Sequence, residues 1–141
     1  MIFARVHHIA IICSDYERSK HFYVDILELS IVRETCRAER DSYKLDLQIP
    51  GGIQIELFSF PQPPPRLTRP EACGLRHLAF AVNNLDEAVA YLNAQGVETE
   101  AIRMDELTHR QFTFFRDPDD LPLELYESES PANLGRLPIV Q

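Results

Sequence analysis

The sequence predicts an α+β protein built from two tandem βαβββ modules. A strand-like segment that carries a histidine occurs twice, and so does one that carries a glutamate; the four are VHHIAII at 6–12, GIQIELF at 52–58, LRHLAFAV at 75–82 and LPLELYE at 121–127. Glu56 follows His8 by 48 residues, and Glu124 follows His77 by 47. Such regular spacing indicates an internal repeat of one structural unit.

The first module is expected at about residues 4–60. A strand over 4–13 leads to Ser14-x-x-Glu17, which has the form of a capping box. The helix that starts there is expected to reach about Leu27, because its apolar residues recur at helical spacing. Three further strands are expected at 29–35, 42–49 and 52–60, with a Pro-Gly-Gly turn before the last.

The second module is expected at about residues 75–127, so that both modules form a single domain over 1–127. Asn84 is expected to start a helix over 84–95, and Gly96 to end it. Strands are expected at 75–82, 97–103, 111–116 and 121–127.

Two segments lie outside these modules. Residues 61–74 form a connector with five prolines, which can be a polyproline ligand or a stiff spacer; its place at the repeat boundary favours the spacer. Residues 128–141 show no clear periodicity and are expected to form a C-terminal tail.

Alternation along the strands separates two faces of each sheet. The apolar rows are expected beneath the helices; they comprise Ile9, Ile11, Ile55, Leu57, Leu78, Phe80, Val82, Leu123 and Leu125. His7 also falls on that face and is expected to be structural. The opposite face carries His8, Glu56, His77 and Glu124 beside small alanines, which leave space for a ligand. Together the two modules are expected to form an open, curved mixed sheet whose cleft holds the four polar groups.

These four residues are candidates for a metal site. A buried carboxylate without a partner costs several kcal/mol, and a divalent cation removes that cost. One histidine or glutamate alone on a strand is more often solvated or hydrogen-bonded than a ligand, but four at repeat-related positions favour a metal. Mixed nitrogen and oxygen ligands suit Ni, Zn, Mn, Fe or Co.

Composition excludes several other classes of protein. The 141 residues carry a net charge of −8, which argues against a nucleic-acid or anionic-membrane surface. No apolar run approaches the roughly 18 residues of a membrane span, and no signal peptide is evident. Three widely spaced cysteines are typical of reduced thiols in a cytoplasmic protein.

The blocks HHIAIICSDYERSKHFYVDIL, IQIELF, GLRHLAFAV and FFRDPDDLPLELYE resemble the vicinal oxygen chelate superfamily, in particular glyoxalase I-like proteins. The resemblance covers residues 5–127 and implies paired βαβββ modules around one divalent metal with two open positions. By the same resemblance the metal ligands are His8, Glu56, His77 and Glu124. A homodimer is implied as well, with the metal site within one chain or across two.

The resemblance also implies a reaction. A glutamate at the second ligand position, Glu56, resembles the isomerase branch of the superfamily. The resemblance implies that the metal there holds two neighbouring oxygens of a small 2-oxo-aldehyde–thiol adduct. Glu124 is the expected catalytic base, and Glu56 can share that role. The alternatives are an epimerase, a thiol transferase of the same superfamily, or a non-catalytic small-molecule binding module. Ile12 stands where bacterial glyoxalase I enzymes carry an arginine, and the candidates to bind an anionic substrate group are Arg37, Arg76 and Arg110.

Overall fold

The computed structural model describes residues 1–128 and forms two compact units, Met1–Arg66 and Leu67–Gln141. The division between them falls within the proline-rich segment 61–74. No helix in the described residues is long and apolar enough to cross a membrane. The tail expected over 128–141 lies, apart from its first residue, outside the described residues.

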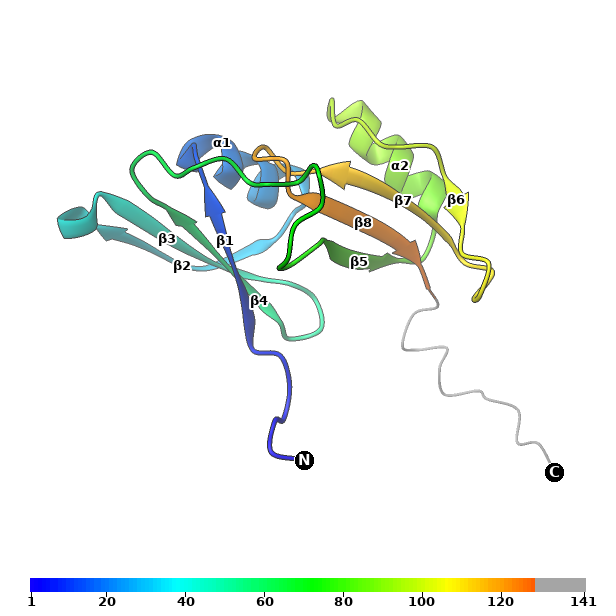
Figure 1. Ribbon diagram of the computed structural model, residues 1–141, viewed down its shortest axis with the longest axis horizontal. Helices are drawn as coiled ribbons and strands as arrows, with labels where there is room; N and C mark the ends of the chain where they lie inside the picture. Colours follow the sequence, from blue (N-terminus) through cyan, green and yellow to red (C-terminus); the bar gives the residue numbers. More distant parts are fainter. Residues whose placement is uncertain (129–141) are drawn as a thin grey trace. The chain divides into compact units, whose positions relative to one another are not determined.

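Unit 1 is a four-stranded mixed sheet with one helical segment (Figure 1). Its strands lie in the order β1-β4-β3-β2; β1 pairs with β4 in parallel and the other pairs are antiparallel. The elements are β1 (His8–Cys13), α1 (Tyr16–Lys20), the π-helix η1 (His21–Ile26), β2 (Ser30–Arg37), the 3₁₀ turn η2 (Ala38–Arg40), β3 (Ser42–Gln48) and β4 (Gln54–Ser59).

Unit 2 repeats this arrangement. Its sheet has the order β5-β8-β7-β6, and β5 pairs with β8 in parallel. The elements are β5 (Leu78–Val82), α2 (Leu85–Ala94), β6 (Arg103–Met104), β7 (Gln111–Arg116) and β8 (Pro122–Glu127). The predicted α+β class with tandem βαβββ modules is thus confirmed, and both sheets are open rather than closed into a barrel.

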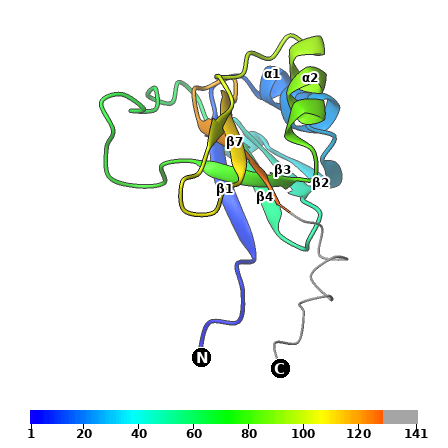
Figure 2. The same cartoon turned by 90° about the vertical axis from the view of Figure 1, so that its right-hand side faces the viewer.

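Each helix covers one face of its own sheet, as Figure 2 shows for α2 and the sheet of unit 2. The apolar row of β4, Ile55 and Leu57, is fully buried, and Leu123 and Leu125 are buried at the same places in β8. The alternation that buries these residues directs Glu56 and Glu124 to the other face. We call that other face the helix-free face of each unit.

The helix starts follow from single side chains. Asp15, not Ser14, caps α1, because its carboxylate accepts a hydrogen bond from the backbone N–H of Arg18. The predicted capping box at Ser14 was therefore one residue early. Asn84 caps α2 as predicted, by accepting from the backbone N–H of Glu87.

Three predicted boundaries were wrong. The first strand begins at His8 rather than at residue 4, and the strand expected from residue 75 begins at Leu78. The strand expected at 97–103 is reduced to Arg103–Met104. The reason lies at Glu100. Its backbone N–H donates to the carbonyl of Phe114, but its own carbonyl accepts a hydrogen bond from the hydroxyl of Thr113. Regular backbone pairing with β7 therefore does not develop there.

Candidate metal centre

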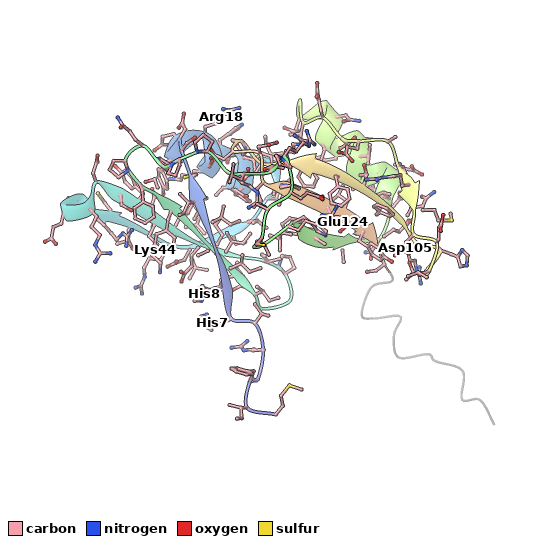
Figure 3. The ribbon with its side chains drawn as sticks, viewed as in Figure 1. His7, His8, Arg18, Lys44, Asp105 and Glu124 are labelled. Atoms are coloured by element: carbon pink, nitrogen blue, oxygen red, sulfur yellow. The ribbon has the colours of Figure 1, made fainter. Side chains whose placement is uncertain are left out.

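Unit 1 contains one candidate ligand pair, a histidine and a glutamate. Parallel pairing of β1 with β4 sets Ala10 directly opposite Glu56. His8 is two residues before Ala10 and therefore shares its face. His8 Nε2 lies 3.5 Å from Glu56 Oε2, and the two side chains are 43% and 17% exposed. His8 is labelled at the start of β1 in Figure 3.

Unit 2 contains the equivalent pair. Ala79 of β5 lies opposite Glu124 of β8, and His77 stands two residues before Ala79, just outside the strand. His77 Nε2 is 2.9 Å from Glu124 Oε2, and the exposed fractions are 29% and 13%. An alanine therefore lies beside each carboxylate, as the sequence pattern predicted.

The separation within each pair fits two neighbouring ligands of one cation. Ligands about 2.1 Å from a metal and about 90–110° apart lie about 3.0–3.4 Å from each other. The observed nitrogen–oxygen distances of 3.5 and 2.9 Å bracket this range. Within the described part of either unit, no third His, Cys, Asp or Glu side chain joins its pair to make a larger metal-binding group. Each unit therefore contains one histidine–glutamate pair with the spacing of two metal ligands.

The glutamate of unit 1 has an additional partner that the sequence analysis did not identify. Lys44 of β3 places its ammonium 3.3 Å from Glu56 Oε1 and 3.0 Å from Asp46 Oδ1. Asp46 is buried and lies directly opposite Glu56, so without a cation two carboxylates would face each other. Hydrogen bonds to Asp46 and then to Glu56 raise the pKa of Lys44, which keeps the lysine charged.

The glutamate of unit 2 has an aromatic neighbour instead. Phe114 of β7 lies opposite Glu124, at the place that Asp46 takes in unit 1. Its ring makes an edge-to-face contact with the ring of His77, with centroids 5.2 Å apart. His77 Nδ1 is buried and has no hydrogen-bond partner within residues 1–128, and Nε2 is the ring nitrogen that faces Glu124.

His7 proves to be a neighbour of the site rather than part of the core. The sequence placed it on the helix-covered face, but it precedes β1 and is exposed. Its Nδ1 lies 2.9 Å from Nδ1 of His8, so one of the two rings donates to the other. When His8 is the donor, its Nδ1 carries the proton and its Nε2 is left available as a ligand. The HH pair in the sequence was the available signal for this role.

The structure thus brings together His8 with Glu56 and His77 with Glu124, with His7 beside His8, and leaves His21 and His109 elsewhere. His21 forms an exposed pair with Asp25 on the helical segment, at 2.7 Å. His109 is exposed in the loop between β6 and β7. That both pairs bind one shared cation stays a prediction.

Of the three arginines considered for an anionic substrate group, Arg37 is the one on a helix-free face. Arg37 lies at the end of β2, opposite Ser42 of β3. Ser42 is two residues before Lys44 and shares its face of the sheet. Arg76 forms an exposed ion pair with Glu71 at 2.7 Å. Arg110 lies in the loop after β6.

Comparison with known proteins is consistent with this arrangement. The family model described as Glyoxalase/Bleomycin resistance protein/Dioxygenase superfamily matches residues 5–125. The uncharacterized protein YwkD of Bacillus subtilis is 64% identical over 90% of this chain and 99% of its own, and the uncharacterized protein YaeR of Escherichia coli is 59% identical over 87% and 95%. The crystal structure of a glyoxalase family protein from Enterococcus faecalis is 49% identical, with a TM-score of 0.84 over 90% of this chain and all of that one.

Proposed function

Because the chain belongs to the glyoxalase/bleomycin resistance protein/dioxygenase superfamily, which includes many enzymes, we propose that it is a metal-dependent, glyoxalase I-like lyase or isomerase. Its proposed substrate is a small 2-oxo-aldehyde–thiol adduct. The observation that supports this most directly is the repeated pair: in each unit a histidine Nε2 and a glutamate Oε2 lie at the separation of neighbouring metal ligands.

In this proposal His8, Glu56, His77 and Glu124 bind one divalent cation, drawn from Ni, Zn, Mn, Fe or Co. Two carboxylates balance the charge of the cation, and two neutral imidazoles add nitrogen ligands. When bound, the cation supplies the Lewis acidity that draws electron density from two neighbouring oxygens of the substrate. The small side chains Ala10 and Ala79 leave room for those oxygens beside the carboxylates.

The two glutamates have different roles in the proposal. Glu56 is held from both sides, by His8 at Oε2 and by Lys44 at Oε1. Among residues 1–128, Glu124 has one polar side-chain partner, His77, and its cross-strand neighbours Ala79 and Phe114 carry no charge. Glu124 can therefore turn toward a substrate C–H without breaking an ion pair with a lysine, and we assign it the proton transfer.

Metal analysis of the purified full-length protein tests the proposal first. We expect about one divalent cation per chain, and a marked loss of metal in His77→Ala and in His8→Ala. His21→Ala is the matched control, because it removes a histidine that is also paired with a carboxylate but lies on the exposed side of a helix. A wild type that neither contains metal nor takes up added Ni, Zn or Mn contradicts the proposal.

Activity is the second test. The metal-loaded protein is assayed with methylglyoxal and a series of thiols, glutathione among them, by following formation of the thioester. Turnover with one of these thiols supports the lyase. Metal binding without turnover of any adduct favours the non-catalytic binding module over the enzyme. The homodimer and the cytoplasmic location implied by the resemblance stay predictions.

A further inference from the structure

An aromatic platform lies beside the candidate metal ligand of unit 1. The rings of Phe58 and Phe60 stack with centroids 6.0 Å apart and planes 9° from parallel. Phe58 is two residues after Glu56 on β4 and shares its face, and Ile12 of β1 lies opposite Phe58. Ile12 is 55% exposed and Phe60 is 36% exposed, so apolar surface remains accessible here.

Arg37 lies over this platform. The centre of its guanidinium is 5.0 Å from the Phe58 ring and 5.5 Å from the Phe60 ring. One terminal nitrogen, Nη2, donates to the hydroxyl of Ser42 at 2.7 Å. Stacking on two rings and the bond to Ser42 restrict the guanidinium to one orientation, so less entropy is lost when it binds a ligand.

Arg37 lacks the partner that an arginine in so acidic a protein is expected to have. The chain carries a net charge of −8, yet no carboxylate among residues 1–128 forms an ion pair with Arg37. Its Nε is buried and has no hydrogen-bond partner in the described part of the chain. A half-buried cation with unused donors is costly, and an anionic ligand group would remove that cost.

Arg103 of unit 2 provides an internal comparison. Its guanidinium also lies over two phenylalanine rings, Phe112 at 5.1 Å and Phe114 at 5.6 Å. Arg103, however, forms an ion pair with Glu100 at 3.2 Å. Stacking on two rings is therefore shared by both arginines, and the missing carboxylate is particular to Arg37.

We propose that Arg37, with the surface of Ile12, Phe58 and Phe60, is a specificity subsite that binds the anionic end of an amphipathic substrate. The guanidinium takes an oxyanion, carboxylate or phosphate, and the apolar surface takes the stem that links it to the reacting oxygens. Two residues along a strand span about 7 Å, which sets the distance from the Glu56 position to the Phe58 position. This inference rests on the proposed function, because the ligand is a substrate only if the protein is an enzyme. Binding at the subsite itself can be tested without metal.

The test is an NMR titration of the metal-free, full-length protein with three probes. Phenylacetate has a ring and a carboxylate, phenyl phosphate has a ring and a phosphate, and phenylacetamide has the same ring without charge. We expect phenylacetate or phenyl phosphate to shift the Nε–H signal of Arg37 and the backbone signals of Phe58 and Phe60, and to bind about tenfold tighter than phenylacetamide. Equal affinity for phenylacetamide overturns the proposal, and the stronger of the two anions identifies the oxyanion.

Three variants locate the effect. Arg37→Leu is expected to bind the preferred anion about tenfold more weakly, and Arg37→Lys to recover part of that loss, because lysine keeps the charge but not the planar donor fork. Arg103→Leu is the matched control and should bind as the wild type does. Equal losses in Arg37→Leu and Arg103→Leu contradict the subsite. The titration of the wild type does not depend on the folding of any variant. The metal content of Arg37→Leu should equal that of the wild type, so a failure of the subsite proposal can be told from a failure of the metal-site proposal.

Discussion

The two units of this protein share a fold but surround their histidine–glutamate pairs differently. In unit 1 the glutamate lies between an imidazole and the ammonium of Lys44, next to the buried Asp46. In unit 2 the glutamate has a tighter contact with its histidine, and Phe114 replaces the acidic neighbour. The comparison teaches that both units keep the histidine–glutamate pair, whereas the neighbouring strand of each sheet determines which further side chains contact the carboxylate.

The largest expected effect tests the different roles of the two glutamates. Glu124→Gln should lower kcat about a thousandfold per bound metal ion, because an amide cannot accept the proton. Glu56→Gln should lower the metal content but cost less activity per bound ion, since the proton transfer is assigned to Glu124. Kinetics are measured alongside metal analysis of the same samples. Glu127→Gln, on the same strand but on the other face, is the control; equal kinetic and metal defects in both variants would remove the distinction.

A second comparison concerns the two cores. Leu57→Ala in β4 and Leu125→Ala in β8 remove equivalent buried side chains, so each should lower the free energy of unfolding by about 3 kcal/mol. Denaturant titrations give the total loss, and amide hydrogen exchange shows where protection is lost. We expect each variant to lose protection mainly in its own unit. Equal loss of protection throughout residues 1–128 would show that the two units open together.

Removal of Lys44 sharpens the contrast around the carboxylates. Lys44→Met leaves Asp46 and Glu56 facing each other without a cation, and should lower the free energy of unfolding by about 2 kcal/mol. Added divalent metal should stabilise this variant more than the wild type, because the metal takes over the missing positive charge. Thermal denaturation with and without metal measures both effects.

Lys20→Met is the control for that experiment, since it removes an ion pair with Glu34 that lies away from the site. Its loss should be at most about 1 kcal/mol and should not depend on metal. Equal metal stabilisation of Lys44→Met and the wild type would argue against a role for Lys44 near the cation.

The smallest effect concerns a polar contact that ties α1 to the sheet of unit 1. Tyr16 donates to Glu34 at 2.9 Å, and Lys20 pairs with the same carboxylate at 2.8 Å. Hydrogen bonds from Lys20 and Tyr16 hold the pKa of Glu34 below its ordinary value. Tyr16→Phe should cost about 1 kcal/mol at neutral pH.

The pH dependence of this contact follows from the lowered pKa. Its contribution is complete above the ordinary pKa of the glutamate and is lost as the pH falls through the lowered pKa of the folded protein. The difference between wild type and Tyr16→Phe should therefore shrink in acid, as measured by urea titrations at several pH values. In a Glu34→Gln background the substitution should cost less at neutral pH; an unchanged cost would assign the effect to packing.

Local patterns in the sequence identified much of this fold and the four candidate ligands. Alternation around Glu56 and Glu124 was sufficient to assign their faces, because Ile55, Leu57, Leu123 and Leu125 mark the buried side. The repeat then pointed to both histidines. Their proximity to the glutamates depends on parallel pairing between strands far apart in the chain, which no local pattern contains.

What the sequence did not reveal depends on contacts across strands. Lys44 reads as an ordinary charged residue on an alternating strand, and its position between two carboxylates follows from the register of β3 with β4. The short β6 depends on the hydroxyl of Thr113, which takes the carbonyl of Glu100. His7 was misplaced because alternation was extended past the true start of β1. Such errors occur where a side chain or a strand end overrides the period of the segment.

The presence of both modules in one polypeptide has an evolutionary consequence. A symmetric assembly of single modules would have to carry every substitution twice, so a lysine beside one carboxylate would appear beside the other as well. Covalent linkage of the copies lets each accumulate its own changes. Lys44 in the first copy and Phe114 in the second are differences of this kind, and they give the carboxylates at two equivalent positions different surroundings.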